Sequence, residues 1–308
     1  MSLQFPPSLR VGDCVAIVSP SGKISNQWVQ GASWLLRSWG LQPLSMPHVL
    51  AEHGRYAGTV DQRLVDLQAA LDNPQIKGIL CSRGGYGVVH LLNRLDFAGF
   101  RQSPKWVMGF SDITALHNRI QYEGFASLHT PMARHLTEEG PDDKSTLYLK
   151  DLLFGHKPRY VWEPHALNRC GRVKGILRGG NLAVGYGLRA TPYDWPMDNT
   201  VLFLEDVGER PHAVERMLYN LKLSGAFDRL KGLIIGRFTE YDDPDMALGK
   251  PLYEAIADVV AGYDFPVCYG FPVGHVKDNW PLIVGSEVGL SVSSTEVVLD
   301  FNSIDALR

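Results

Sequence analysis

The sequence lacks an apolar run long enough to cross a membrane, because no stretch approaches the roughly 20 apolar residues that a spanning helix needs. It also lacks an excess of charge: 30 Lys and Arg against 33 Asp and Glu give a formal net charge of −3. Nothing in this balance attracts the chain to nucleic acid or to an anionic membrane, so we expect neither as a partner. The N-terminal residues show no basic start followed by an apolar core, so we expect no signal peptide and a cytoplasmic protein.

Patterns for metals, disulfides and nucleotide cofactors are missing as well. The four cysteines lie far apart without a Cys-x-x-Cys pair, and there is no His-Glu-x-x-His motif. His129 and His135 have no acid at ligand spacing. His90 stands where a dinucleotide fingerprint needs Gly or Ala, and Ile24 stands where a phosphate-binding P-loop needs Ser or Thr. We therefore expect no metal and no cofactor.

The first half of the chain alternates short apolar runs with helical periodicity. Apolar runs at 14–18, 78–81 and 106–110 predict buried strands. Helices are predicted after the first run, from a capping box formed by Thr59 and Gln62, and from Gly87 to about Leu95. This alternation predicts an α/β domain with a parallel sheet and flavodoxin- or Rossmann-like layers.

The second half has a different pattern. Apolar runs at 173–177, 201–204 and 233–235, and others near Val267, Ile283, Leu290 and Val297, predict strands. Apolar residues at 214, 217, 218 and 221 predict a helix that ends at Gly225. Between the halves, around 137–170, acidic residues and prolines interrupt the pattern. We therefore expect an N-terminal domain over 1–160 and a C-terminal domain over 161–308.

The segment Gly109-Phe110-Ser111-Asp112 indicates chemistry more than any other. A predicted strand runs directly into a predicted helix with Ser111 at the turn, as in the nucleophile elbow of hydrolases. The backbone N–H of Asp112 would then lie at a helix N-terminus, where it can face an oxyanion. Ile113 stands where the hydrolase motif has glycine. On this pattern alone, Ser111 is either a nucleophile or a helix N-cap.

A serine nucleophile needs a base, and the base needs an acid to orient it. His275 follows a segment of small and rigid residues at the end of a predicted strand, and Glu205 and Asp206 follow the apolar strand at 201–204. Carboxylates at such a place are costly to bury without partners, so they often belong to sites. The alternatives are a surface histidine and acids that serve the next helix. Ser111, Glu205 and His275 occur in the chain order of a hydrolase triad.

Two glycine-rich segments, 83–87 and 178–182, are predicted at strand-to-helix junctions. Glycines there let backbone N–H groups point into a cavity, or they allow a tight turn with close helix packing.

Eight short segments occur together in one order along the chain. They are Val18-Ser19-Pro20-Ser21, Tyr56-Ala57-Gly58-Thr59, Arg83-Gly84-Gly85-Tyr86-Gly87, Gly109-Phe110-Ser111-Asp112, Gly179-Gly180-Asn181-Leu182, Leu204-Glu205-Asp206, Glu215-Arg216-Met217-Leu218 and Gly274-His275. This set resembles the LD-carboxypeptidases, also called muramoyltetrapeptide carboxypeptidases, a serine peptidase family that also contains the microcin C immunity proteins. The resemblance extends from about residue 12 to 290.

The resemblance implies both a site and a function. Ser111 matches the nucleophile of the family, Glu205 the acid, His275 the general base, and the backbone N–H groups of Gly85 and Asp112 the oxyanion hole. It implies an N-terminal α/β domain with a parallel sheet, a C-terminal α/β domain with an incomplete β-barrel, and a homodimer. The family removes the terminal D-Ala from murein tetrapeptides in cell-wall recycling, so a muropeptide is the implied substrate.

Several points stay open. Arg83 and Arg178 are candidates to bind the terminal carboxylate of a substrate, and a structural ion pair is the alternative for each. The loop 276–285 and Thr130 depart from the family pattern. Two other functions are possible readings: an immunity-type serine peptidase that cleaves an aminoacyl-nucleotide conjugate, with Trp280 as a stacking aromatic, and a non-enzymatic binder of small molecules.

Overall fold

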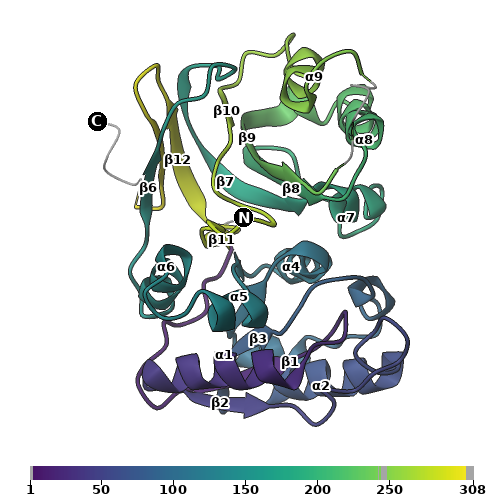
Figure 1. Ribbon diagram of the computed structural model, residues 1–308, viewed down its shortest axis with the longest axis vertical. Helices are drawn as coiled ribbons and strands as arrows, with labels where there is room; N and C mark the ends of the chain where they lie inside the picture. The colour runs from purple at the N-terminus through teal and green to yellow at the C-terminus, as the bar shows by residue number, and fades with distance from the viewer. Residues whose placement is uncertain (1–2, 242, 244–247, 303–308) are drawn as a thin grey trace. The chain divides into compact units, whose positions relative to one another are not determined.

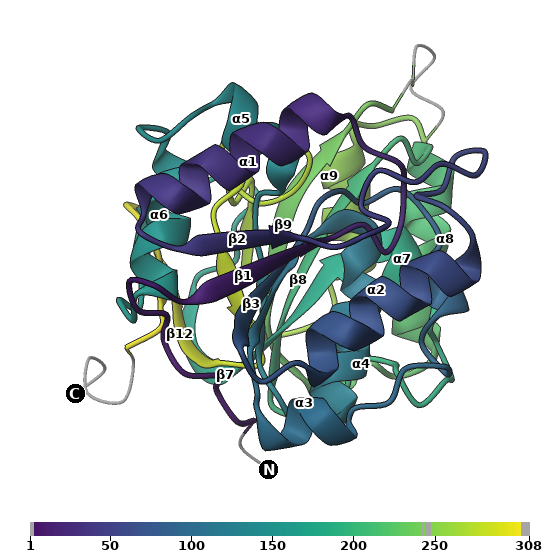
Figure 2. The ribbon, with the colours of Figure 1, turned by 90° about the horizontal axis from the view of Figure 1, so that it is seen from below.

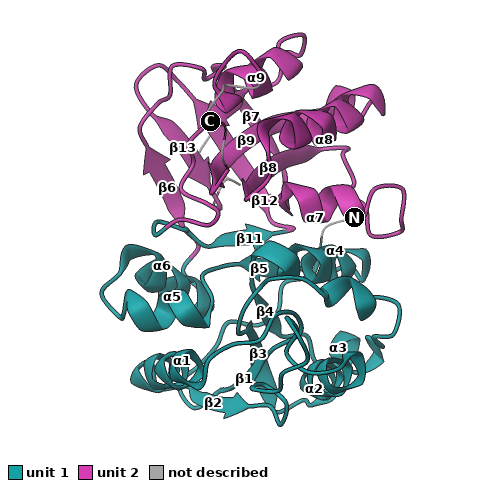
Figure 3. Cartoon of the chain, turned by 45° about the vertical axis from the view of Figure 1, so that its right-hand side comes forward, with its two compact units in different colours: residues 1–156, 277–284 teal, residues 157–276, 285–308 magenta. Residues whose placement is uncertain are grey.

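The computed structural model describes residues 3–241, 243 and 248–302, and the chain forms two compact units (Figure 3). Unit 1 consists of Met1–His156 and Lys277–Val284, and unit 2 of Lys157–Val276 and Gly285–Arg308. The sequence interpretation placed one boundary after residue 160. The chain instead leaves unit 1 after His156 and returns to it for residues 277–284, which fall inside the expected 161–308 domain.

Unit 1 is built on a sheet with the strand order β11-β5-β4-β3-β1-β2. The strands from β2 to β5 are parallel, as expected, and β11 pairs antiparallel with β5. The bounds of these strands are β1 (Cys14–Val18), β2 (Gln42–Ser45), β3 (Ile76–Cys81), β4 (Trp106–Gly109), β5 (Ser127–His129) and β11 (Leu282–Val284). Apart from the short edge strand β2, their side chains are mostly buried, which is typical of a sheet covered on both faces.

Helices cover both faces of this sheet. Figures 2 and 3 show α1, α5 and α6 on one side and α2, α3 and α4 on the other. Their bounds are α1 (Asn26–Ser38), α2 (Val60–Asp72), α3 (Ala98–Gln102), α4 (Thr114–Tyr122), α5 (Ala133–Glu138) and α6 (Lys144–Leu153). The capping box of Thr59 and Gln62 is confirmed at the start of α2. The helix expected from Gly87 to about Leu95 is wrong, since only a 3₁₀ turn, Val88–His90, forms there.

Unit 2 has a mixed sheet with the order β10-β9-β8-β7-β12-β13-β6. The strands from β10 to β7 are parallel, and those from β7 to β6 are antiparallel. The bounds are β6 (Arg159–Trp162), β7 (Gly171–Asn181), β8 (Thr200–Val207), β9 (Leu230–Thr239), β10 (Val267–Tyr269), β12 (Glu287–Val292) and β13 (Val297–Asp300). Within the described residues the strand order ends at β10 and β6, so the sheet is open, and Figure 1 shows the bend of β7.

Three helices pack on the parallel part of this sheet, namely α7 (Leu182–Gly187), α8 (Pro211–Leu223) and α9 (Leu252–Val259) (Figure 1). The predicted stripe on α8 is buried against strand residues such as Leu202, Leu204 and Ile235. This apolar layer holds the strands so that the carboxyl ends of β7, β8, β9 and β10 lie along one edge. In the part of the chain that the structure describes, no helix has both the length and the apolarity needed to cross a membrane.

Candidate active site

In unit 1, the strand-to-helix turn after β4 has the backbone of a nucleophile elbow. Ser111 follows β4 and Phe110 and starts a 3₁₀ turn, Ser111–Ile113, that leads into α4. Its φ is 63°, in the left-handed region that costs a non-glycine residue roughly 1–2 kcal/mol. Ser111 does not cap this turn, because Phe110 holds the N-cap position and no side chain makes a capping hydrogen bond there. The geometry therefore favours the elbow over the N-cap interpretation.

The glycine-rich loop after β3 packs directly against this elbow. A Cβ atom added to Gly84 would lie 2.7 Å from Ser111 Cβ, 2.9 Å from Ser111 Oγ and 3.4 Å from the backbone nitrogen of Asp112. Only glycine allows so close an approach. The carbonyl of Gly84 accepts a hydrogen bond from the N–H of Gly22 at 3.0 Å, and Gly85 has a φ of 119°. The loop that carries the N–H of Gly85 therefore lies beside Ser111, because glycine adopts the required backbone conformation without strain.

The side chain of Asp112 ties three segments of unit 1 together. Its Oδ2 accepts hydrogen bonds from Ser21 Oγ at 2.6 Å and from the N–H of Val88 at 3.0 Å, and the residue is 3 % exposed. The sequence pattern assigns Asp112 a backbone N–H for the oxyanion or a charge that complements the helix dipole. It does not indicate that the carboxylate binds two loops, because the loops that follow β1 and β3 are far from Asp112 in the sequence.

In unit 2, a carboxylate and an imidazole form a pair at the carboxyl edge of the sheet. Glu205 lies near the end of β8, is 0 % exposed, and has its Oε2 2.8 Å from Nδ1 of His275. His275 belongs to the loop that follows β10 and contains Gly274, whose φ is 124°. A Cβ on Gly274 would lie 3.0 Å from both Cβ and Oε2 of Glu205. Glycine at 274 therefore lets the loop come close enough for the pair to form.

Opposing effects set the pKa of His275. Burial of the ring lowers this pKa, but the hydrogen bond and the charge of Glu205, with smaller contributions from Asp206 and Glu240, raise it more. The net result is a pKa above the ordinary value of a histidine. A carboxylate can only accept, so Nδ1 carries the hydrogen that is donated to Glu205, and Nε2 then carries the lone pair.

Asp206, the next residue on β8, is held by hydrogen bonds of its own. Its carboxylate accepts hydrogen bonds from Nδ2 of Asn181 at 2.9 Å, from the N–H of Ala183 at 2.8 Å and from the N–H of Val207 at 2.8 Å. Burial raises the pKa of Asp206 to about 6, with a further contribution from the charge of Glu205. These bonds join the ends of β7 and β8, whose residues Asn181 and Glu205 are partners in the sheet.

The two candidate arginines differ in their surroundings. Arg83 is exposed, lies in the loop of Gly84, and donates from Nη1 to the carbonyl of Lys23 at 2.9 Å. Arg178 lies on β7, is 9 % exposed, and has a pKa lowered by burial. Of the expected site residues, Arg83, Gly85, Ser111 and Asp112 come together in unit 1, and Arg178, Glu205 and His275 lie in unit 2.

The loop that departs from the family pattern is anchored in unit 1. Residues 282–284 form β11, Lys277 Nζ lies 2.7 Å from Glu139 Oε2, and the ring of Trp280 packs edge-on against Tyr148 with centroids 5.5 Å apart. Trp280 is 5 % exposed. The aromatic proposed for nucleotide stacking is therefore buried and packs against Tyr148 of α6.

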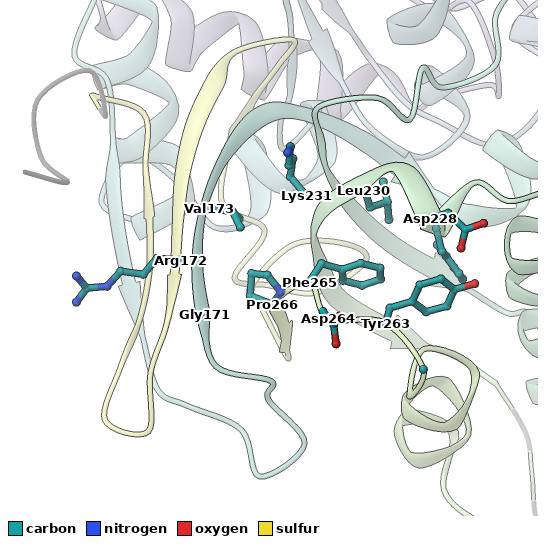
Figure 4. Close-up of a pocket in the computed structure, with 12 residues that line it drawn as sticks. Gly171, Arg172, Val173, Asp228, Leu230, Lys231, Tyr263, Asp264, Phe265 and Pro266 are labelled. Carbon is teal, nitrogen blue, oxygen red and sulfur yellow. The ribbon is translucent and has the colours of Figure 1, made fainter.

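Unit 2 also has a hollow of ≈ 500 Å³ near the amino ends of β7 and β9, shown in Figure 4. It is lined by the aromatic rings of Phe227, Tyr263 and Phe265, with Asp228 and Lys231 at its border. Because parallel strands carry their amino and carboxyl ends at opposite edges, this hollow is separate from the Glu205–His275 pair. Among residues 3–241, 243 and 248–302, no group of three or more His, Cys, Asp or Glu side chains could hold a metal ion.

Comparison with known proteins assigns the chain to a family. Residues 15–130 match the family described as the LD-carboxypeptidase N-terminal domain, and residues 174–290 match the LD-carboxypeptidase C-terminal domain. The chain belongs to the LD-carboxypeptidase family. Both expectations, the family and its two-part α/β fold, are thereby confirmed.

Individual relatives in the LD-carboxypeptidase family match this chain over nearly its full length. The murein tetrapeptide carboxypeptidase of Pseudomonas aeruginosa is 31% identical over 87% of this chain and 90% of its own. The crystal structure of the muramoyltetrapeptide carboxypeptidase from Oxalobacter formigenes has a TM-score of 0.85 at 30% identity and covers 93% of this chain and 98% of that one. The microcin C7 self-immunity protein MccF of Escherichia coli is 24% identical over 94% of this chain and 93% of its own. The chain is thus a member of a peptidase family.

Proposed function

We propose that this protein is a serine carboxypeptidase that removes the terminal D-Ala from murein tetrapeptides. It cuts the bond between the L-configured centre of a diamino acid and D-Ala. The observation that carries the proposal is the buried carboxylate of Glu205, 2.8 Å from Nδ1 of His275. This is the relation that makes an imidazole a general base in a serine peptidase triad. The backbone of Ser111 and the names of the relatives support the same reading.

In the proposed acylation step, Nε2 of His275 takes the proton of Ser111 as Oγ attacks the scissile carbonyl carbon. Glu205 keeps the hydrogen on Nδ1 and stabilises the imidazolium that forms. The N–H groups of Gly85 and Asp112 bind the oxygen that becomes negative. Donors of this kind contribute roughly 3–4 kcal/mol each to the stability of the transition state.

The tetrahedral intermediate then collapses as the C–N bond to D-Ala breaks. The imidazolium of His275 gives its proton to the departing amine, and D-Ala leaves. A water molecule, deprotonated by the same imidazole, attacks the ester on Ser111 and releases the shortened peptide. As that ester bond breaks, the imidazolium gives the water's proton to Ser111 Oγ, so Ser111 and His275 regain their starting protonation states and Glu205 keeps its charge throughout the cycle.

A carboxypeptidase also has to bind the free carboxylate of its substrate. Arg83 and Arg178 are the proposed candidates, because guanidinium groups bind carboxylates through two parallel hydrogen bonds. Arg83 is the more accessible of the two and shares a loop with Gly85. We further propose cytoplasmic cell-wall recycling and a homodimer as the setting of this activity.

The test is release of D-Ala from a purified murein tetrapeptide, followed by mass spectrometry. Peptides with meso-diaminopimelate and with Lys at the third position are compared, and a peptide that ends in L-Ala is the stereochemical control. The proposal expects D-Ala from at least one substrate, none from the control peptide, and none with Ser111→Ala. Release at the wild-type rate by Ser111→Ala would contradict the proposed nucleophile.

A second candidate function is cleavage of an aminoacyl-nucleotide conjugate, since a relative bears the name of a microcin self-immunity protein. The burial of Trp280 removes the aromatic that was expected to stack on the nucleotide. An aminoacyl sulfamoyl adenosine, assayed beside the tetrapeptide, distinguishes the two. A kcat/KM higher for the nucleotide conjugate would replace the first proposal with the second.

A further inference from the structure

A buried arginine that no proposed step uses lies behind the glycine-rich loop of unit 1. Arg63 belongs to α2 and is 2 % exposed. Its Nη1 donates to the carbonyl of Pro20 at 2.8 Å and to the carbonyl of Gly87 at 2.9 Å. Burying a guanidinium costs several kcal/mol unless its hydrogen bonds compensate. Arg63 offsets part of that cost by hydrogen bonding to two loops that are far apart in the sequence.

Both loops leave the same edge of the sheet as the elbow. Pro20 follows β1 and Gly87 follows β3, and the pairings of β1 with β3 and of β3 with β4 are parallel. Loops at the carboxyl ends of such neighbours are adjacent to each other. Arg63 therefore holds two loops that lie next to the loop of Ser111, although its own hydrogen bonds do not reach the elbow.

One peptide group of the loop is held at both of its ends. The carbonyl oxygen of Gly87 accepts from Arg63, and the N–H of Val88, in the same planar peptide, donates to Asp112 Oδ2 at 3.0 Å. A peptide held at its oxygen and at its nitrogen cannot rotate about the chain direction. Asp112 is also the residue whose own N–H is proposed to bind the oxyanion.

The loop needs such an external constraint because its own backbone is soft. Gly85 and Gly87 have φ values of 119° and 132°, and glycine has a wide choice of conformations there. A Cβ on Gly87 would lie 2.7 Å from Nη1 of Arg63, so the backbone and the guanidinium are in direct contact. His90, whose Nδ1 lies 3.2 Å from Nη2 of Arg63, extends this contact to the end of the 3₁₀ turn.

We infer that Arg63 is a positioning residue for the oxyanion hole. By holding the peptide between Gly87 and Val88, it sets the course of the loop and hence the direction of the N–H of Gly85. The inference rests on the proposed serine peptidase function. A misdirected donor weakens binding of the transition state and leaves binding of the ground state nearly unchanged, so the loss falls on kcat.

The experiment compares Arg63→Met and Arg63→Lys with wild type in two assays. One is kcat and KM for D-Ala release, and the other is the rate at which a fluorophosphonate labels Ser111, since its phosphoryl oxygen occupies the place of the oxyanion. For Arg63→Met we expect about a 10²-fold loss in kcat and in labelling rate, as for loss of one oxyanion donor, with KM changed less than threefold. For Arg63→Lys, which keeps the charge and an ammonium group with three N–H donors, we expect a smaller loss in both.

The matched control is Arg94→Met, which removes another arginine of unit 1. Arg94 pairs with Asp61 through exposed side chains and should change neither kcat nor labelling. Wild-type protein that neither releases D-Ala nor is labelled would refute the proposed function. Active wild type with a folded Arg63→Met variant that keeps kcat and labelling within threefold would refute this inference alone. If Arg63→Met does not fold, Arg63→Gln takes its place, because its shorter, uncharged side chain cannot reach both carbonyls, and a folded Arg63→Gln variant with an unchanged kcat would overturn the positioning role.

Discussion

Replacing Glu205 with glutamine tests the proposed triad most directly. The wild-type carboxylate accepts the hydrogen of His275 Nδ1 across 2.8 Å and is fully buried. A glutamine amide can turn its NH₂ group toward Nδ1, and the imidazole then places its hydrogen on Nε2. That tautomer cannot take a proton from Ser111. The corresponding exchange in other triads lowers kcat roughly 10⁴-fold, which is about 5 kcal/mol of activation free energy, and we expect a loss of this order.

The same substitution also predicts the direction of a pH shift. Burial lowers the pKa of His275, whereas the hydrogen bond and charge of Glu205 are the largest of the effects that raise it. A general base works in its neutral form, so kcat/KM falls as the pH drops through the raised pKa. Without the charge at 205 this pKa is lower, and the acid limb of the residual activity moves to lower pH.

The assay is kcat/KM for D-Ala release from pH 5 to 9, with thermal unfolding to verify the fold. Glu240→Gln is the matched control, because Glu240 contributes least of the four carboxylate effects on the pKa of His275 and is exposed. We expect near-normal kcat and a small shift of the acid limb for this control. Wild-type activity of Glu205→Gln across the whole range would show that Glu205 has only a structural role.

Four further outcomes follow from the structure. Ser111→Ala should abolish D-Ala release without lowering the melting temperature, and activity that survives would mean another nucleophile. Gly84→Ala places a Cβ 2.7 Å from Ser111 Cβ, so kcat should fall about 10²-fold, and an unchanged kcat would show that the elbow yields freely. Burial raises the pKa of Asp206 from 3.8 to about 6, so the free energy of unfolding should fall by about 3 kcal/mol as the pH rises through that interval. Asp206→Asn should remove this fall from denaturant titrations, and an equal pH slope in the variant would refute it. Burial lowers the pKa of His117 from 6.5 to about 4, so the free energy of unfolding should fall by about 3 kcal/mol as the pH drops between these values. His117→Gln should remove this fall from denaturant titrations, and an equal pH slope in the variant would refute it.

The sequence predicts best those elements that combine an apolar pattern with a residue that marks where the element begins or ends. The strand at 14–18 and the capping box at Thr59 correspond to β1 and the start of α2. The expected helix beyond Gly87 did not form. Leu91 and Leu95 have helical spacing and are buried, but the chain makes a 3₁₀ turn at Val88–His90 and continues in turns. The spacing of apolar residues indicates which side chains are buried, and it does not distinguish a continuous helix from successive turns.

Arg63 shows a second limit of sequence patterns. The apolar residues of α2 at positions 60, 64, 67 and 71 have the spacing of one helix face. The structure buries Leu67 and Leu71 of this set, leaves the residues at 60 and 64 half-buried, and buries Arg63 as well. Positions 63, 67 and 71 are four residues apart, so the sequence already places them on one face of a helix. The acceptors for the guanidinium are 43 and 24 residues away along the chain, so only the folded loops reveal why a charge lies on that face.

The strand β11 has a consequence for how the protein is made. Its residues Leu282–Val284 are paired with Ser127–His129 of β5, at the edge of a sheet whose other strands come from the first half of the chain. A ribosome has to synthesise the chain as far as residue 284 before that edge is covered, and until then β5 presents open hydrogen-bonding groups to other chains. We therefore expect a fragment that ends at His156 to aggregate, and a fragment with residues 277–284 joined to it through a linker to remain monomeric.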